Sequence, residues 1–503
     1  MTRRPTPRLL PLAALLLAAG LTGCAVTPTP LTTQERASTA QSDRDAMFAH
    51  QEPLSGPVTL EEAMARAIRY NLDQRVKLME QALAQRQLDI AGIDLLPKLA
   101  LSAGYTSRDN VLASSSRDIS TGKQSLVPST STEKSVGTAD LGLTWNVLDF
   151  GVSYYDARQQ ADRTLVAEER RRKVVHLLMQ QTRQAYWQAA GAQMLQGRID
   201  PVLAQARQAL ADARKVEAEK LRSPLESLNY QRQLLDIVRQ LEAVRDELAQ
   251  AKPRLASLMN LSPGTPFEVV VPGAMPVPGI SLPMAAMEET ALVRRPELVE
   301  AQYNERIGVL ETRKALARLL PGLEISLGGH YDSNSYLVNQ QWADAGLRVS
   351  WNLLNVFQAD TLRGAAQAQV DLARQQRLAL DMAVLTQVHV ADLGYKSQRR
   401  QFDLVRQMND VDQRILTYTQ AATASDAQGQ LEEIRAAAAA MMSELRLYQS
   451  YGALQGAYGQ VIATLGLDPL PASVPAEDIG TLSKAVGQSE AAWVKTVDPG
   501  AGS

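Results

Sequence analysis

The sequence predicts a mostly α-helical fold with a small transmembrane β part. Two structural repeats each combine a β-hairpin with long antiparallel coiled-coil helices. Three observations predict this fold. The Leu-Leu-Pro segment at 95–97 recurs at 319–321, and the segment around Trp145 recurs around Trp351. Four segments alternate apolar and polar residues, and long helical stretches with heptad spacing follow them. A repeat of about 200 residues is too long for a solenoid unit, so the chain consists of two similar halves of one body.

The N-terminal residues are expected to be a targeting segment. Three arginines within the first eight residues precede an apolar run that is too short to span a bilayer. Leu21-Thr22-Gly23-Cys24 then resembles the cleavage box of bacterial lipoproteins, which implies a signal peptide over 1–23 and a lipid on Cys24. The alternative is an incidental cysteine in a signal peptide. Residues 24–57, rich in Thr, Pro, Ser and Gln, are expected to form a lipidated tether.

The composition argues against several function classes. A net charge of −2 gives no basic surface for nucleic acid. The four histidines lack metal-ligand spacing, and no Walker A loop, HExxH motif or nucleophile elbow is present. Gly452, Gly456 and Gly459 lie inside a helical pattern with no strand before them, which favours close helix packing over a nucleotide loop. The chain is therefore expected not to be an enzyme, and to carry no metal and no cofactor except the lipid on Cys24.

The first repeat is expected over 58–262. A helix begins after the N-cap residue Thr59 and ends before Pro97, and a β-hairpin follows over 98–149. A long helix over 152–221 comes next. The last helix, 224–261, begins with Pro224, whose missing N–H costs little in a first turn. A linker over 263–283 leads into the second repeat.

The second repeat is expected over 284–470. It contains a helix over 284–320, a β-hairpin over 322–354, and helices over 359–427 and 430–466, followed by a C-terminal tail over 471–503. The helices match those of the first repeat in length. The repeats differ in the length of their hairpin loops, which span about 108–135 in the first repeat and about 333–343 in the second. Each half is thus a long rod lined by two shorter helices stacked end to end.

The alternating segments are expected to be strands with one apolar and one polar face. Their apolar residues fall at every second position, as in a barrel wall with lipid outside and a polar lumen. Tyr105, Trp145, Tyr331 and Trp351 are expected to form its aromatic belt. A soluble antiparallel sheet has the same pattern strand by strand. The lipoprotein signal favours the barrel.

Helix 224–261 carries a heptad pattern. Leu234, Leu241, Leu248 and Leu255 are seven residues apart, and each is followed three residues later by an apolar residue. Such a seam over four heptads predicts coiled-coil packing.

This order of motifs resembles the TolC-type outer-membrane channel family, the outer membrane factors. The Leu-Leu-Pro segments, the Trp-Asn strand ends and the closing segments Leu261-Ser262-Pro263-Gly264 and Leu467-Asp468-Pro469 carry the resemblance, which covers about 58–470. It implies a homotrimer with a 12-stranded barrel and an α-helical tunnel. It also implies a location in the outer membrane of a Gram-negative bacterium, anchored by lipid and extending into the periplasm. The elementary physics agrees, because four strands cannot close a barrel alone.

The resemblance implies a passive exit duct of a tripartite efflux or type I secretion system. Its partners would be a periplasmic adaptor, an inner-membrane pump and outer-membrane lipid, but no nucleic acid. Drug, metal and protein cargo are not separable from this sequence. A lipid-anchored periplasmic coiled-coil scaffold without a pore is the alternative.

The resemblance also places two candidate sites. The adaptor-docking tips correspond to Ser223, Leu225, Glu226, Leu228, Gly429, Leu431, Glu432 and Ile434. Alternatively, these are ordinary turn residues, with Glu favourable at a helix N-terminus, and Pro224 departs from the family's Gly-rich tip. The candidates for a ring of carboxylates at the aperture are Asp410, Asp412 and Asp426. Asp410 and Asp412 lie about 200° apart around a helix, so at most one faces the lumen; solvated helix-face carboxylates are the alternative.

Overall fold

The computed structural model describes residues 28–146, 149–219, 223–271, 273–424, 429–471 and 478–500. The chain divides into two units, 1–51 and 52–503. In its described part, the first unit contains helix α2 (Thr33–Met47), which begins with a capping box formed by Thr32 and Glu35. The segment expected to be a tether therefore includes a helix. Cys24 lies outside the described residues.

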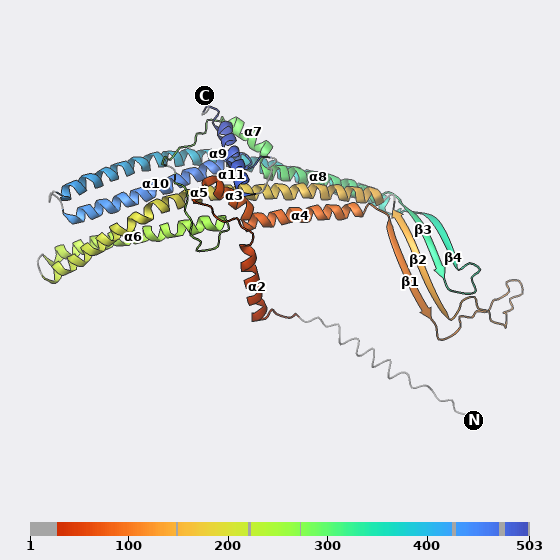
Figure 1. Ribbon diagram of the computed structural model, residues 1–503. Helices are drawn as coiled ribbons and strands as arrows, with labels where there is room; N and C mark the ends of the chain where they lie inside the picture. The colour runs from red at the N-terminus through yellow and green to blue at the C-terminus, as the bar shows by residue number, and fades with distance from the viewer. Residues whose placement is uncertain are drawn as a thin grey trace. The chain divides into compact units, whose positions relative to one another are not determined.

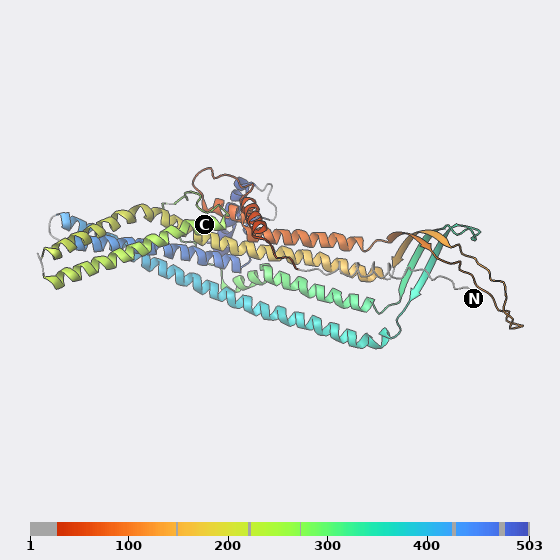
Figure 2. The same ribbon diagram turned by 90° about the horizontal axis from the view of Figure 1, so that it is seen from below.

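The second unit contains a four-stranded antiparallel sheet at one end of its helices (Figures 1 and 2). Its strands are β1 (Lys98–Ser107), β2 (Ser135–Asn146), β3 (Gly322–Asp332) and β4 (Gln341–Ser350). Their order is β1-β2-β3-β4, so the two hairpins join through β2 and β3. Both β1 and β4 are edge strands whose residues are exposed throughout.

Two expected helices are each divided in two. The first becomes α3 (Leu60–Tyr70) and α4 (Leu72–Ile93), because Asn71 leaves the helical conformation and accepts hydrogen bonds from the backbone N–H groups of Asp73 and Gln74. The second becomes α7 (Met284–Arg294) and α8 (Pro296–Ala317). Here Arg295 is extended, as a proline at the next position favours.

The long helices are matched between the halves. The rods α5 (Asp149–Ala218) and α9 (Asn355–Ala424) have 70 residues each, and α6 (Pro224–Leu258) and α10 (Gln430–Thr464) have 35 each. Next to the sheet the helices contact one another in the order α4-α5-α8-α9, and farther from it in the order α6-α5-α10-α9. The helix α9 therefore forms one edge along the whole length, and α4 followed by α6 forms the other.

The predicted heptad seam is confirmed. Leu234, Leu241, Leu248 and Leu255 are at most 4% exposed and pack mainly against apolar residues of α5. Full burial of one leucine stabilises a fold by roughly 1.5–3 kcal/mol, so this seam holds the α5–α6 pair together. The close helix packing predicted at the three glycines of α10 is also present. Cβ atoms added to Gly452, Gly456 and Gly459 would lie 3.3–3.5 Å from glutamines of α5.

The closing motif of each half is a helix C-terminus in which one residue adopts a positive φ. These residues are Asn260 (φ 57°) and Gly466 (φ 68°), and the N–H groups of Leu261 and Leu467 donate back to the carbonyls of Ala256 and Ile462. A Cβ on Gly466 would lie 2.7 Å from the backbone of Arg294. Only glycine fits this position.

The expected C-terminal tail contains helix α11 (Ile479–Val497), which Asp478 caps and which packs on α3. Its buried residues are Ile479, Leu482, Ala485, Val486, Ser489, Trp493 and Val497. The small residues among them hid this amphipathic pattern in the sequence. Among the described residues, the structure contains no helix with the length and apolar character for a membrane span.

Candidate functional site

The first tip, where α6 begins, presents apolar side chains to solvent. Ser223, Pro224 and Glu226 are exposed, and Leu225 and Leu228 are 70% and 52% exposed. Pro224 is the first residue of α6, as expected for a residue without an N–H. Two exposed leucines one turn apart form a small apolar surface at this tip.

The second tip, where α10 begins, is more buried. Gly429 and Glu432 are exposed, Leu431 is half-buried and Ile434 is 0% exposed. Ile434 belongs to the core that α5, α6 and α10 share, so the structure contradicts its assignment to the docking surface. The physical reason is the position of α10, which contacts both α5 and α9, whereas α6 lies at an edge.

A groove of about 360 Å³ joins the two tips. Glu226 and Ser227 line it from the first tip, and Gly429, Gln430 and Leu431 line it from the second. Sequence reasoning missed the other lining residues, Ala209, Asp212, Ala213, Val216 and Tyr230. Most of them belong to α5, and no local pattern in the sequence distinguishes them from other positions on that rod.

The two described aperture candidates lie on different sides of α9. The Asp410 side chain is 71% exposed and lies 3.9 Å from the Arg414 guanidinium, whereas Asp412 is half-buried. Asp426 lies outside the described residues. On the helical wheel, Arg399, Asp403 and Arg406 share the face of Asp410. This face therefore carries both signs of charge rather than a purely acidic surface.

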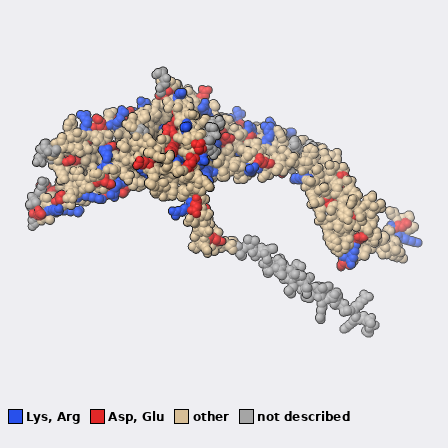
Figure 3. All heavy atoms as spheres, viewed as in Figure 1, with Lys and Arg blue, Asp and Glu red and all other residues tan. Residues whose placement is uncertain are grey.

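One face of the sheet is apolar and ends in aromatic residues. Tyr105 and Tyr331 lie near the end away from the helices, and Trp145 and Trp351 lie near the helical end. Ala139 pairs with Tyr331, and Trp145 is six residues farther along β2, or about 20 Å. The exposed aliphatic side chains between them include Leu99, Leu101, Leu141, Leu327 and Leu347. In Figure 3 the visible part of the sheet is mostly uncharged, whereas charges are scattered over the helices.

The edge helices also expose apolar seams at heptad spacing. The α9 seam consists of Leu404, Met408, Val411, Ile415 and Tyr418, which are 47–70% exposed. The α4 seam consists of Leu72, Val76, Met79, Leu83, Ile90 and Ile93, which are 37–64% exposed. On the other edge farther from the sheet, α6 exposes Leu228 and Leu235. Heptad stripes that face solvent in one chain are typical of helices that pack against another copy.

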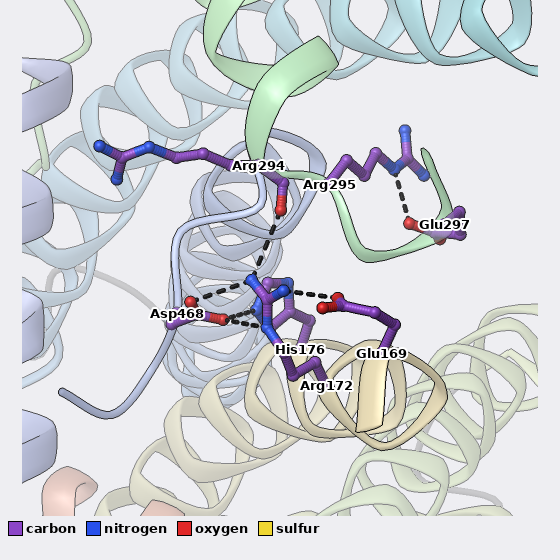
Figure 4. A network of polar contacts seen from close by, with 7 residues as sticks. All are labelled: Glu169, Arg172, His176, Arg294, Arg295, Glu297 and Asp468. Carbon is purple, nitrogen blue, oxygen red and sulfur yellow. Dashed lines mark hydrogen bonds and ion pairs between the residues drawn. The ribbon is translucent and has the colours of Figure 1, made fainter. Parts of the chain in front are cut away.

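A polar cluster, the junction network, joins segments far apart in sequence (Figure 4). Arg172 of α5 donates to Asp468 (3.0 Å) and to Glu169 (2.5 Å), and its Nη2 also approaches the carbonyl of Arg294. The buried His176 ring lies 3.0 Å from Asp468. The network therefore fastens the end of the second repeat and the α7–α8 junction to the first rod.

The two carboxyls of this network have opposite pKa shifts. Burial raises the pKa of the Glu169 carboxyl despite the charge of Arg172. Burial also acts to raise the pKa of Asp468. The hydrogen bond from His176 and the charge of Arg172 outweigh it, so the pKa of Asp468 lies below its usual value of 3.8.

Acidification is expected to remove the contribution of Asp468 to stability. A lowered native-state pKa means that this contribution is present above about pH 4 and is lost as the pH falls through the native-state value. At neutral pH, Asp468→Asn is expected to cost about 1 kcal/mol, because the side chain is 46% exposed and solvent screens it. Denaturant unfolding at several pH values measures the difference in the free energy of unfolding between the unaltered protein and Asp468→Asn, here called the gap. A gap that stays constant down to pH 3 would contradict this assignment.

Comparisons with known proteins agree with the architecture. No family model matches the sequence, and no curated protein does. Among solved structures, the chain is similar to the Campylobacter jejuni CmeC outer membrane channel, with a TM-score of 0.62, 12% identity, and coverage of 93% of this chain and 98% of that one. It is similar to the outer-membrane channel OprN, with a TM-score of 0.59, 16% identity, and coverage of 81% and 89%. It is also similar to the open state of the Neisseria gonorrhoeae MtrE outer membrane channel, with a TM-score of 0.58, 15% identity, and coverage of 81% and 88%. The chain has the fold of the TolC-like outer membrane factors.

Proposed function

We propose that three copies of this chain form an outer-membrane channel that serves as the passive exit duct of a tripartite efflux or type I secretion system. The observation that carries the proposal is the matched order of strands and helices. The sheet order β1-β2-β3-β4 continues into the helix order α4-α5-α8-α9, and both layers are open at the same two edges. A wall with two unlike open edges closes when copies join head to tail around an axis.

The exposed seams support this closure. The β4–α9 edge of one copy would meet the β1–α4 edge of the next near the sheet, and its α6 edge farther away. Both edges carry apolar side chains along these contacts. Near the sheet, Leu372 and Met382 of α9 would face the α4 seam that includes Val76. Farther away, Met408 and Val411 of α9 would face Leu235 of α6. Three copies would supply twelve strands, which removes the sheet edges that lipid cannot accommodate.

The aromatic ends of the sheet support insertion in the outer membrane. An apolar face about 20 Å long between Tyr and Trp residues resembles the lipid-facing band of outer-membrane barrels. The lipid on Cys24 would anchor the chain to the same membrane. The helical rods would then extend into the periplasm.

The tips would dock a periplasmic adaptor, which connects the duct to an inner-membrane pump. Leu225 and Leu228 are the exposed apolar residues at the first tip, and the groove between the tips adds Leu431. Ser223, Glu226, Gly429 and Glu432 would form the polar rim. Of the two described aperture candidates, Asp410 is the better candidate for a carboxylate that faces the lumen, because its side chain is 71% exposed and Asp412 is half-buried.

Two measurements test the channel. The purified protein is expected to migrate as a heat-sensitive trimer and to conduct ions in a planar bilayer. Deleting the gene is expected to raise drug accumulation or to lower the level of an exported protein. A folded trimer that conducts in no variant with an opened tip would instead favour a periplasmic scaffold without a pore.

Adaptor docking has its own test. Leu225→Glu is expected to weaken transport in cells at least about tenfold, because it places a charge in an apolar contact. Thr417→Glu, which adds the same charge on an exposed face of α9 outside its apolar seam, is the matched control for docking. Trimer formation and bilayer conductance of Leu225→Glu should stay at the level of the unaltered protein. Unchanged transport with Leu225→Glu would argue against docking at this tip.

A further inference from the structure

The polar face of the sheet carries a row of side chains that runs across all four strands. Ser102 pairs with Asp140, Asp140 with His330, and His330 with Trp342. Asp344, two residues beyond Trp342 on β4, points back to the same histidine. We call Ser102, Asp140, His330, Trp342 and Asp344 the histidine row. It brings together residues up to 242 positions apart, from 102 to 344.

His330 lies between two carboxylates. Its Nδ1 is 2.6 Å from Oδ1 of Asp140, and its Nε2 is 3.0 Å from Oδ2 of Asp344. A neutral imidazole carries one N–H and can donate to only one of these carboxylates, whereas an imidazolium donates to both. With both carboxylates ionised, the geometry therefore fits the protonated ring, which joins β2, β3 and β4 through their side chains.

The surroundings favour this arrangement. The Trp342 ring stacks on the imidazole with centroids 5.1 Å apart and planes at 18°, an arrangement that favours a cationic ring. Gly328 leaves the necessary space, since a Cβ there would lie 2.5 Å from Nε2 of His330 and 2.8 Å from Oδ1 of Asp344. The imidazole side chain is 23% exposed, so protons and ions reach it from this face.

Other charged groups on the same face lie farther along the strands. Asp332 is two residues beyond His330 on β3, and β2 carries no charged residue on this face except Asp140. Toward the helices lie Lys98 of β1 and the pair of Glu324 and Arg348, whose closest atoms are 3.7 Å apart. Of the residue types on this face, histidine is the one whose charge changes near neutral pH.

We propose that the histidine row is a pH-dependent selectivity site on the lumenal wall, which favours the passage of small cations when His330 is neutral. This inference rests on the proposed trimeric channel, in which the polar face lines the lumen. With His330 protonated, the imidazolium and the two carboxylates sum to one negative charge per copy; with His330 neutral they sum to two. Deprotonation also leaves one carboxylate without its donor, and that carboxylate then faces the lumen.

The test measures reversal potentials of the full-length trimer in planar bilayers under a potassium chloride gradient. Between about pH 5 and about pH 8, the permeability ratio of potassium to chloride is expected to rise about two- to fivefold. His330→Asn removes the titrating group and is expected to give a ratio that does not change with pH. The matched control is His389→Asn, because His389 also bonds a carboxylate, Glu288 at 2.7 Å, on the helical part. It should behave like the unaltered protein.

A second readout does not depend on conduction. An imidazolium stacked on an indole quenches its fluorescence, so the emission of the trimer is expected to increase on deprotonation. The increase should disappear in His330→Asn and in Trp342→Phe. Gly328→Val, which fills the space beside Nε2, should displace the ring and reduce the titration amplitude while the titrating group remains.

The outcomes separate the two proposals. A conducting trimer whose permeability ratio does not depend on pH, or depends on it equally in His330→Asn, overturns the selectivity site and leaves the channel intact. An emission titration that survives in His330→Asn overturns the protonated arrangement. A folded trimer that never conducts overturns the proposed function and the selectivity site with it.

Discussion

Replacing Val411 and Ile415 together by glutamate is expected to convert the trimer into monomers whose helices remain folded. Both side chains lie in the middle of the α9 seam and are about half exposed in one chain, at 51% and 49%. In the proposed trimer they are buried against the next copy. Burying an unpaired carboxylate costs several kcal/mol. Because every 1.4 kcal/mol changes an association constant tenfold, the association of the copies is expected to weaken by at least about a thousandfold. Light scattering in detergent measures the mass, and circular dichroism checks the helices.

The opposite face of the same helix provides a matched control. Thr417 and Gln420 are exposed and lie at least about 100° around the helix from every residue of the seam. The double variant Thr417→Glu with Gln420→Glu adds the same two charges, and it is expected to remain trimeric. If both double variants stay trimeric, or both dissociate, the assignment of the seam to the contact between copies is wrong.

Replacing Arg183 by methionine is expected to lower the free energy of unfolding by about 3–5 kcal/mol, because one partner of a buried ion pair is removed. Arg183 is 7% exposed, and its guanidinium donates to Glu490 of α11 and to Oε1 of Gln455 of α10 (3.0 Å) and lies over the ring of Tyr458. Methionine keeps most of the apolar contact but leaves the Glu490 carboxyl without its cation. Denaturant titration of the detergent-solubilised protein measures the loss.

Two further measurements identify the cause of that loss. Burial raises the pKa of Glu490 even with Arg183 present, so without Arg183 its ionisation costs more, and the loss should grow as the pH rises from 5 to 8. Adding Glu490→Gln to Arg183→Met should recover more than half of it. As a surface comparison, Arg170→Met removes an exposed pair with Glu300 and should cost less than about 1 kcal/mol. Equal losses of stability in Arg183→Met and Arg170→Met would argue against a larger contribution from the buried pair of Arg183 and Glu490.

Local periodicity was enough to predict the elements themselves. The heptad spacing from Leu234 to Leu255 predicted a buried seam, and those leucines are buried because an amphipathic helix of 35 residues has one apolar stripe to cover. The alternation around Leu141 and Leu327 likewise predicted strands, since successive side chains of a strand point to opposite faces. These features depend on neighbours a few residues apart.

Other features were missed because their signals were weak or not local. The apolar pattern showed two helices as continuous that the structure divides. The Asn71 side chain caps the start of a new helix, and a proline follows Arg295. The helix α11 was missed because its buried face includes Ala485 and Ser489. The repeat offset of 206 residues, from Trp145 to Trp351, relates Leu228 to Ile434 in sequence, but it does not predict that one is exposed and the other is in the core.

The sequence by itself determined the two-part repeat, the strands and the lengths of the rods, because backbone preferences and side-chain periodicity act within a few turns. Only the tertiary structure decided which faces are buried and which residues meet. It placed α10 between α5 and α9, which buries Ile434, and it left the α9 seam open for another copy. It also paired β2 with β3, which brings Asp140 within hydrogen-bond distance of His330, 190 residues away. Contacts at such separations depend on how whole elements pack, and no local pattern encodes them.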